Sequence, residues 1–247
     1  MFLVPGLIFY NMSLDKHKRK FLDPAYLYGS MKNTPCFLLG NAPSLTDNNL
    51  KLLDNYFTVG INRILNAYDP TLLIWQDLAL WQSEKNKILN SKCIKYARTG
   101  SESHGCFFGF LLKDREPRIA PDLKTLYGRG SSGSIAYQLV FALGCSPIIL
   151  VGMDCKYDDK GKTDFYGNNS MHRPHTLPAC NKGLEFIKNN AHDRTLINCS
   201  GNRIFEKRYS LEEAIKMLPL ESIGNREKFQ RQLLGDNYNS VMEIMFR

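Results

Sequence analysis

The 247-residue sequence lacks the signatures of several common protein classes. It contains no G-x-G-x-x-G and no Walker phosphate loop, so neither an ordinary dinucleotide site nor an ordinary ATP site is indicated. It has no internal repeat and no low-complexity linker. The apolar opening, residues 1–12, is interrupted by Pro5 and Gly6 and has no basic residue before it. We therefore expect neither a signal peptide nor a transmembrane segment, and we expect this opening to pack on the domain.

The seven cysteines form no C-x-x-C pair, and several of them stand in apolar, strand-like runs. The odd count argues against a closed disulfide framework, and the absence of paired spacing argues against a zinc site. We therefore expect reduced thiols in a cytoplasmic protein without a structural metal centre.

What is present in quantity is positive charge, with a formal net charge of +8 and a pI of about 9.1. This charge favours an anionic partner: a nucleotide, a nucleic acid, an anionic glycan or a membrane surface. Residues 1–34 carry five basic side chains against two acidic ones, which we interpret as a solvated arm. Hydrophobic residues make up 43% of the chain, enough for a sizeable core.

Short apolar runs alternate with amphipathic segments from residue 35 onwards. Continuous apolar runs are typical of strands buried on both faces. Six are predicted as strands: 36–39, 57–61, 72–75, 93–96, 147–151 and 195–198. Five segments are predicted as helices: 46–55, 78–89, 132–143, 177–190 and 211–217, the last with a capping box. This alternation predicts an α/β fold with a Rossmann-like, doubly wound, mostly parallel sheet.

The predicted organisation has three parts. Residues 1–34 form a basic extension, residues 35–205 a nucleotide-binding transferase domain, and residues 206–247 a helical C-terminal extension. Residues 98–130 and 152–175 break the alternation and are predicted to be lid or binding loops.

The stretch FLLGNAPSL, residues 37–45, ends the first predicted strand of the domain. Ligands of open α/β sheets bind beyond the carboxyl ends of the strands. Gly40 allows a close backbone approach, and Asn41 and Ser44 can bind phosphate or ribose. Pro43 starts a helix whose free N–H groups favour phosphate. A tight strand-to-helix turn with a capping side chain explains the same residues.

Polar residues also follow the next two strands. Asn62 either faces the same crevice or caps a helix. The guanidinium of Arg63 can bind a phosphate or a carboxylate, but a surface side chain is the favoured interpretation. Asp77 either caps the following helix or binds a hydroxyl group or a metal.

Two later stretches complete the candidate set. Ser131, Ser132 and Gly133 begin a helix suited to an anion, although close helix packing also accounts for small residues there. Asp154 follows a strand and can accept hydrogen bonds from ribose hydroxyls. In the loop after it, Tyr157 and Tyr166 can donate to a phosphate, and a histidine can remove a proton from an acceptor hydroxyl.

In this order, the motifs G-N-A-P-S-L, G-I-N, S-S-G, G-M-D and a histidine before K-G-L-E-F resemble the small bacterial sialyltransferases. The wider group includes flagellin-modifying motility accessory factors, archaeal 6-hydroxymethylpterin diphosphokinases and phage-encoded proteins. The resemblance covers roughly residues 35–205 and implies a GT-A-like variant of the fold.

The resemblance implies roles for individual residues. It implies that Asn41 and Asn62 bind the nucleotide-sugar donor, and that Ser132 with Gly133 contacts the donor sugar carboxylate. It places Arg129 at the position of an arginine in that family and Asp154 near the ribose. It also places Tyr157 and Tyr166 at the donor phosphate, and His175 at the position of the general base. His172 has no counterpart. Where the sialyltransferases place an asparagine, this chain has Gln76 and Asp77, and an aspartate repels a sialic acid carboxylate.

The expected function is a glycosyltransferase that moves a sugar from a nucleotide-sugar, CMP-linked among the candidates, to an acceptor hydroxyl. No cofactor is required, and the acceptor is a glycan or a modified nucleobase. One alternative is a diphosphokinase of the hydroxymethylpterin type, in which Asp77 and Asp154 bind Mg²⁺. Another is a phage DNA-base-modifying transferase whose basic arm contacts DNA, and a non-catalytic nucleotide-binding module is the fourth.

Overall fold

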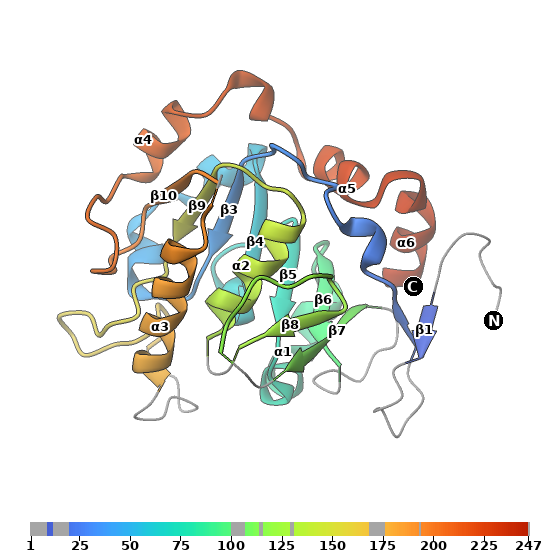
Figure 1. The fold of residues 1–247 in the computed structure, drawn as a ribbon, viewed down its shortest axis with the longest axis horizontal. Helices are drawn as coiled ribbons and strands as arrows, with labels where there is room; N and C mark the ends of the chain where they lie inside the picture. The colour runs from blue at the N-terminus through green and yellow to red at the C-terminus, as the bar shows by residue number, and fades with distance from the viewer. Residues whose placement is uncertain are drawn as a thin grey trace.

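The computed structural model forms three layers, with helices on both faces of a twisted sheet (Figure 1). It describes residues 9–11, 20–99, 107–113, 116–128, 131–167, 176–192 and 194–246. The layers follow from the sequence, because strands that are apolar on both faces need cover on both sides.

The described strands form one ten-stranded sheet with the order β1-β2-β7-β6-β5-β4-β3-β9-β10, and β8 pairs with β7. Their bounds are β1 Phe9–Asn11, β2 Lys20–Leu22, β3 Cys36–Leu39, β4 Phe57–Ile61, β5 Leu72–Trp75, β6 Ile94–Arg98, β7 Phe108–Lys113, β8 Thr125–Tyr127, β9 Ile148–Val151 and β10 Leu196–Asn198. All pairings are parallel except β1 with β2. The predicted Rossmann-like, mostly parallel sheet is therefore confirmed.

The centre of the sheet is a topological switch point. In register, Phe37 of β3 lies beside Thr58 of β4 on one side and Ile149 of β9 on the other. The chain runs outward from β3 through β4, β5 and β6, and then outward in the opposite direction through β9 and β10. Loops diverge at such a point and leave a crevice beyond the carboxyl ends of the central strands.

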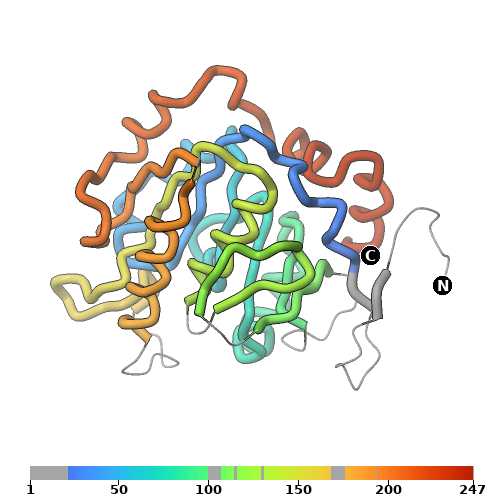
Figure 2. Tube along the Cα trace, viewed as in Figure 1, coloured from blue at the N-terminus to red at the C-terminus, as the bar shows by residue number. Residues whose placement is uncertain are grey.

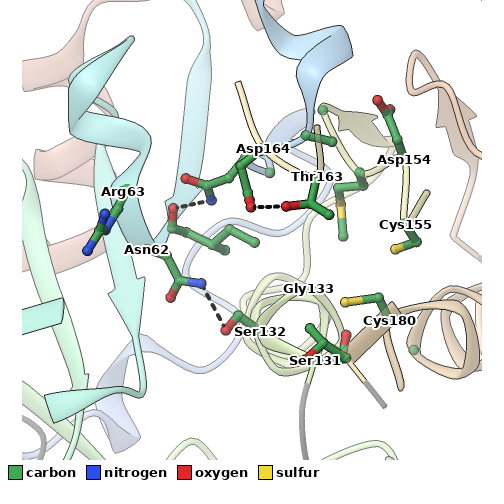
Figure 3. Close-up of a pocket in the computed structure, with 18 of the residues that line it drawn as sticks. Asn62, Arg63, Ser131, Ser132, Gly133, Asp154, Cys155, Thr163, Asp164 and Cys180 are labelled. Carbon is green, nitrogen blue, oxygen red and sulfur yellow. Dashed lines mark hydrogen bonds between the residues drawn. The ribbon is translucent and has the colours of Figure 1, made fainter. Parts of the chain in front are cut away.

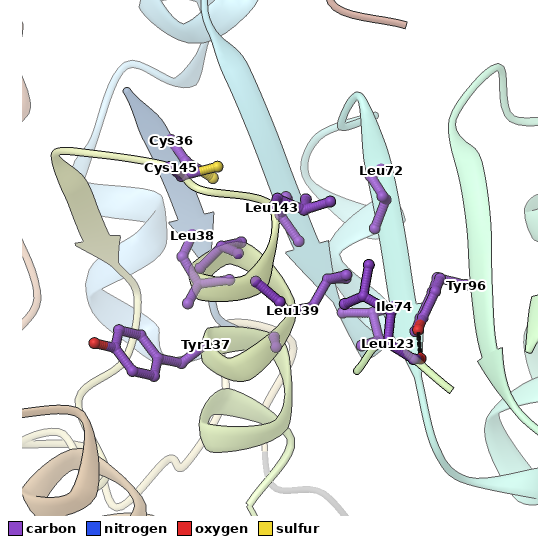
Figure 4. Packing of buried hydrophobic residues seen from close by; sticks show 14 of the residues in the cluster. Cys36, Leu38, Leu72, Ile74, Tyr96, Leu123, Tyr137, Leu139, Leu143 and Cys145 are labelled. Carbon is purple, nitrogen blue, oxygen red and sulfur yellow. Dashed lines mark hydrogen bonds between the residues drawn. The ribbon is translucent and has the colours of Figure 1, made fainter. Parts of the chain in front are cut away.

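Two hydrophobic cores flank the sheet because successive strand residues point to opposite faces. The α-helices are α1 Leu78–Asn90, α2 Ser132–Ala142, α3 Thr176–Asn189, α4 Leu211–Lys216, α5 Arg226–Leu234 and α6 Tyr238–Met245. On one face Leu38 and Ile74 pack with Leu139 of α2, in the cluster that also takes in α3, α5 and α6 (Figure 4). On the other face α1 and α4 cover the sheet, and the rings of Trp75 and Trp81 stack with centroids 6.3 Å apart.

Short 3-10 helices connect much of this framework: η1 Ala25–Leu27, η2 Pro43–Asp47, η3 Leu50–Asn55, η4 Asn62–Asn66, η5 Leu220–Ser222 and η6 Gly235–Asn237. The single helix predicted over 46–55 is therefore wrong, since η2 and η3 take its place. Asn48 is the break, because its backbone is extended and its amide donates to the Ser44 carbonyl at 2.7 Å.

The prediction of a lid loop over 98–130 is also wrong in part. This segment contains β7 and β8, which extend the sheet beyond β6. Phe108 and Phe110 of β7 are fully buried, and the ring of Tyr96 stacks on Phe110 with centroids 5.3 Å apart. By contrast, the described residues 152–167 lie outside helices and strands, apart from one bridge between Asp164 and Gly167 (Figure 2).

The helical tail packs on the central sheet. Phe229 of α5 meets Phe57 of β4 with ring centroids 6.0 Å apart, and Gln230 donates to the carbonyl of Lys92 at 2.8 Å. The predicted capping box of α4 is confirmed, with Ser210 and Glu213 bonding each other's backbone. The division of the chain at residues 34 and 205 stays a prediction. None of the helices in the described part of the chain combines the length and apolar composition needed to cross a bilayer.

Candidate active site

A cavity of about 450 Å³ lies at the switch point, beyond the carboxyl ends of β3, β4, β5 and β9. Its volume is within the range of small-molecule sites. Residues that follow the four strands line it together with the start of α2 and one side of α3 (Figure 3). The topology therefore brings together polar side chains from segments that are far apart in the sequence.

The backbone at the centre of this rim is packed too tightly for side chains. A Cβ built on Gly40 would lie 2.1 Å from the carbonyl oxygen of Gly152. The backbone N–H of Gly40 donates to Val151 at 2.8 Å, and that of Ala42 donates to Gly152 at 2.9 Å. Gly152 itself has a φ of +64°, in the left-handed region. These glycines let the chain leave β3 and β9 in close contact.

Asp154 ties three loops of the rim together. Its buried carboxylate accepts hydrogen bonds from the Ser44 hydroxyl at 2.5 Å, the Ser44 N–H at 3.1 Å and the Gly201 N–H at 2.6 Å. Ser44 belongs to η2 after β3, and Gly201 follows β10. The N–H at the start of η2, which the sequence predicted to favour phosphate, therefore has an acidic partner within the chain. Binding of ribose by Asp154 stays a prediction.

Two asparagines and a glutamine build the polar wall opposite α2. Asn41 donates through Nδ2 to the carbonyl of Ile61 at 2.8 Å. The hydroxyl of Ser132 accepts from Asn62 at 3.1 Å and from Gln76 at 2.9 Å. Asn62 holds this position with a left-handed φ of +49°. The Oδ1 atoms of Asn41 and Asn62 are buried without a hydrogen-bond partner in the described structure, and buried polar atoms are rarely left in that state unless a ligand or water completes them.

The start of α2 opens on the same cavity. Ser131 is its N-cap and accepts from the N–H of Ser134 at 3.3 Å, while Ser132 and Gly133 line the cavity. Close packing of α2 on α3 also depends on small residues, since a Cβ on Gly183 would lie 2.4 Å from the Ser131 hydroxyl. The small residues here therefore serve close helix packing, and anion binding at this helix start stays a prediction.

Charged side chains of both signs line the cavity. Asp77 occupies the N-cap position of α1, yet its side chain makes no capping bond. Burial raises the pKa of its carboxyl group, and the nearby Arg98 partly opposes that effect. Arg63, interpreted from the sequence as a surface residue, lines the cavity with its guanidinium 5.4 Å from the centre of the Tyr166 ring. Its Nε lies 3.7 Å from a carboxylate oxygen of Glu84.

Two cysteines line the wall formed by α3 and the segment after β9. The thiols of Cys155 and Cys180 share a hydrogen bond and face the same space (Figure 3). This contact lowers the pKa of Cys180, whereas the pKa of Cys155 is raised by that hydrogen bond and by burial. Asn181 of α3 donates to the carbonyl of Cys155 at 3.3 Å, so the two segments lie side by side.

The structure brings together most of the residues predicted from the sequence. The lining includes Gly40, Asn41, Asn62, Asp77, Ser131, Ser132, Gly133, Asp154 and Tyr166, and Ser44 supports it through Asp154. Arg129 and His175 lie outside the described residues.

Tyr157 is not among the cavity-lining residues, and 59% of its surface is exposed. The reason is local: Asp158 holds a tight turn by accepting from the N–H groups of Lys160 and Lys162, and this turn carries the chain away from the cavity. Lining residues that the sequence did not single out include Arg98, Cys155, Thr163, Asp164, Thr176 and Cys180.

No family model and no curated protein matches the sequence. Among solved structures, the chain is similar to the MAf glycosyltransferase from Magnetospirillum magneticum AMB-1, with a TM-score of 0.52 at 14% identity. The match covers 89% of this chain and 38% of that one, so this chain spans well under half the length of that protein. The sialyltransferase CstII from Campylobacter jejuni, in complex with cytidine-5'-monophosphate, matches with a TM-score of 0.43 at 13% identity over 70% of this chain and 82% of its own.

At these identities the likeness to the MAf glycosyltransferase shows the fold alone. The TM-score for CstII is too low to support an inference about this chain. The expected resemblance in fold to a glycosyltransferase is confirmed by the MAf match. The expected resemblance to pterin diphosphokinases and phage-encoded proteins stays a prediction.

Proposed function

We propose that the chain is a glycosyltransferase that moves a sugar from a nucleotide-sugar to an acceptor hydroxyl. The observation that carries the proposal is the polar cavity at the switch point, where the Oδ1 atoms of Asn41 and Asn62 are buried without partners. Amide oxygens accept hydrogen bonds, and the amino groups of nucleobases and the hydroxyls of ribose supply them. The location supports a nucleotide as well, because ligands of doubly wound sheets bind at this place.

The first step is to hold the donor phosphate. The N-terminus of α2, with Ser132 and Gly133 on the cavity, offers N–H groups and a positive dipole end. Arg63 and Tyr166 line the same cavity and add donors. Such preorganised donors stabilise the charge that develops on the departing phosphate.

The second step is removal of a proton from the acceptor hydroxyl as the bond between sugar and phosphate breaks. We assign this role to His175, the residue just before α3, because the next residue, Thr176, lines the cavity. Replacement His175→Gln is expected to lower kcat by roughly 10²–10⁴ while donor affinity is kept. His172→Gln is the matched control, since it lies three residues before His175 in the sequence and has no predicted role; its kcat is expected to stay near that of the wild type.

A thermal-shift screen of CMP, UDP, GDP, ADP and ATP, with and without Mg²⁺, tests nucleotide binding. A nucleotide present at 100 times its Kd stabilises the folded state by about 2.7 kcal/mol. For a chain of this size that corresponds to a rise in Tm of roughly 5–11 °C. Failure of every nucleotide to raise Tm would refute the proposed function.

The Mg²⁺-dependent diphosphokinase is the second candidate. Of the two acidic ligands predicted for it, Asp154 already accepts three hydrogen bonds from the chain, whereas Asp77 lines the cavity. Within the described ranges, no three His, Cys, Asp or Glu side chains are grouped as metal ligands. In the thermal-shift screen this candidate predicts a response to ATP that requires Mg²⁺.

A further inference from the structure

The wall of the cavity formed by the ends of β3, β4 and β5 is rich in hydrogen-bond acceptors. Asn41 is only 8% exposed, and its Oδ1 has no partner in the described structure. The orientation of its amide is fixed, because the Ile61 carbonyl can only accept and must face the Nδ2 group. A ligand that completes Asn41 therefore has to bring a donor.

Asp77 adds a carboxylate to the same wall. It immediately follows Gln76, whose amide donates to Ser132, and its own side chain does not cap α1. The carboxylate therefore serves no capping function in the helix that it begins. A carboxylate in a cavity accepts hydrogen bonds from hydroxyl or amino groups and repels other carboxylates.

The two basic side chains of the described lining each have an acidic neighbour. Arg98 interacts electrostatically with Asp77, and Nε of Arg63 lies 3.7 Å from a carboxylate oxygen of Glu84. Asp164 also lines the cavity and accepts a hydrogen bond from Thr163 at 2.9 Å. A sugar carboxylate beside Asp77 would therefore meet like charge, whereas Arg63 remains a donor for the phosphate.

We propose that the donor is a nucleotide-sugar whose sugar is neutral and rich in hydroxyl groups, and that Asp77 selects it by accepting from those hydroxyls. This inference rests on the proposed function and names the donor class for the same cavity.

Two donors that differ in a single group test the inference. UDP-glucose and UDP-glucuronate differ only in a CH₂OH against a carboxylate, and GDP-mannose and GDP-mannuronate form the equivalent pair. The pair used is the one whose nucleotide the protein binds. We expect the wild type to bind the neutral donor of that pair at least about tenfold more tightly than the acidic donor, as measured by titration calorimetry. CMP-sialic acid, which carries a carboxylate, is expected to bind no more tightly than CMP.

The variant Asp77→Asn assigns the selectivity to one residue. It keeps the shape of the side chain, so affinity for the free nucleotide is expected to stay unchanged while the preference for the neutral sugar falls by about tenfold. Asp236→Asn, an exposed aspartate in η6, is the matched control and is expected to keep the full preference. The Tm of each variant shows whether it is folded.

The outcomes separate the two proposals. Equal or tighter binding of the acidic sugar compared with its neutral partner, or tighter binding of CMP-sialic acid than of CMP, would overturn the inference and leave the glycosyltransferase proposal standing. An undiminished preference in folded Asp77→Asn would remove Asp77 as the selecting residue. Absence of binding by any nucleotide or nucleotide-sugar would overturn both proposals together.

Discussion

Replacement of Asp154 by asparagine separates two roles for this carboxylate, as a tie between loops and as a ligand of ribose. In the structure both oxygens face donors: Oδ1 accepts from the Ser44 hydroxyl and the Gly201 N–H, and Oδ2 accepts from the Ser44 N–H. An asparagine offers one oxygen and one NH₂ group. With its oxygen at the Oδ1 position, its NH₂ group points at the N–H of Ser44.

The expected loss follows from these contacts. One charge-assisted hydrogen bond disappears and leaves a buried N–H unpaired, which costs about 1–3 kcal/mol. The other two hydrogen bonds lose their charged acceptor, and a hydrogen bond between neutral groups is roughly half as strong as a charge-assisted one. An amide is cheaper to bury than a carboxylate, and this offsets part of the loss. We expect Asp154→Asn to lower the free energy of unfolding by about 2–4 kcal/mol, or Tm by roughly 4–16 °C.

The assay is urea or thermal unfolding of the protein without nucleotide, next to Asp158→Asn. Asp158 accepts two backbone N–H groups through a single oxygen, which asparagine can reproduce. The control is therefore expected to lose less than about 1 kcal/mol. Unchanged stability of Asp154→Asn, with a loss of nucleotide affinity alone, would refute the role as a tie and favour the ribose contact.

Two further predictions concern the rim and the thiols. Gly40→Ala places a Cβ 2.1 Å from the Gly152 oxygen, so β3 and β9 must separate; we expect a loss of about 1–3 kcal/mol in urea unfolding together with weaker nucleotide binding. Gly161→Ala, whose Cβ meets nothing within 4 Å, should keep that affinity, although its φ of +72° makes an alanine costly to stability there. Wild-type stability of Gly40→Ala would contradict the packing argument. Because its pKa is lowered, Cys180 holds more thiolate at a given pH than the buried Cys93, whose pKa is raised to about 11. Iodoacetamide should therefore modify Cys180 before Cys93 at pH 8, as followed by mass spectrometry, and bound nucleotide should slow the reaction. Faster labelling of Cys93 would contradict this prediction.

The central strands could be predicted from the sequence because each is a continuous apolar run buried on both faces. The predicted bounds of β3, β4 and β5 agree with the structure. The strands β7 and β8 were not predicted, because their pairing depends on distant partners and their segment mixes glycine, aromatic and charged residues. Local pattern therefore predicted the middle of the sheet better than its edge.

The site residues also divide into those that a local sequence pattern indicates and those that depend on distant contacts. Asn41, Asn62, Asp77 and Asp154 could be predicted because each lies within three residues of the end of a strand, and parallel strands end at a common rim. The hydrogen bond from Gly201 to Asp154 spans 47 residues and has no local signal.

Other features of the site also depend on tertiary contacts. The positions of Arg63 and Cys180 are set by packing between elements that are distant in the chain. Tyr157 lies outside the cavity lining, beside a turn held by Asp158, and that turn depends on backbone hydrogen bonds and not on residue type alone.

The most direct test of the central claim is a crystal structure with the nucleotide that gives the largest thermal shift. We predict that this nucleotide lies beyond the ends of β3 and β9, with donor groups within hydrogen-bond distance of Oδ1 of Asn41 and Oδ1 of Asn62. A nucleotide bound elsewhere, for example in the separate cavity lined by Tyr68 and Arg226, would contradict it.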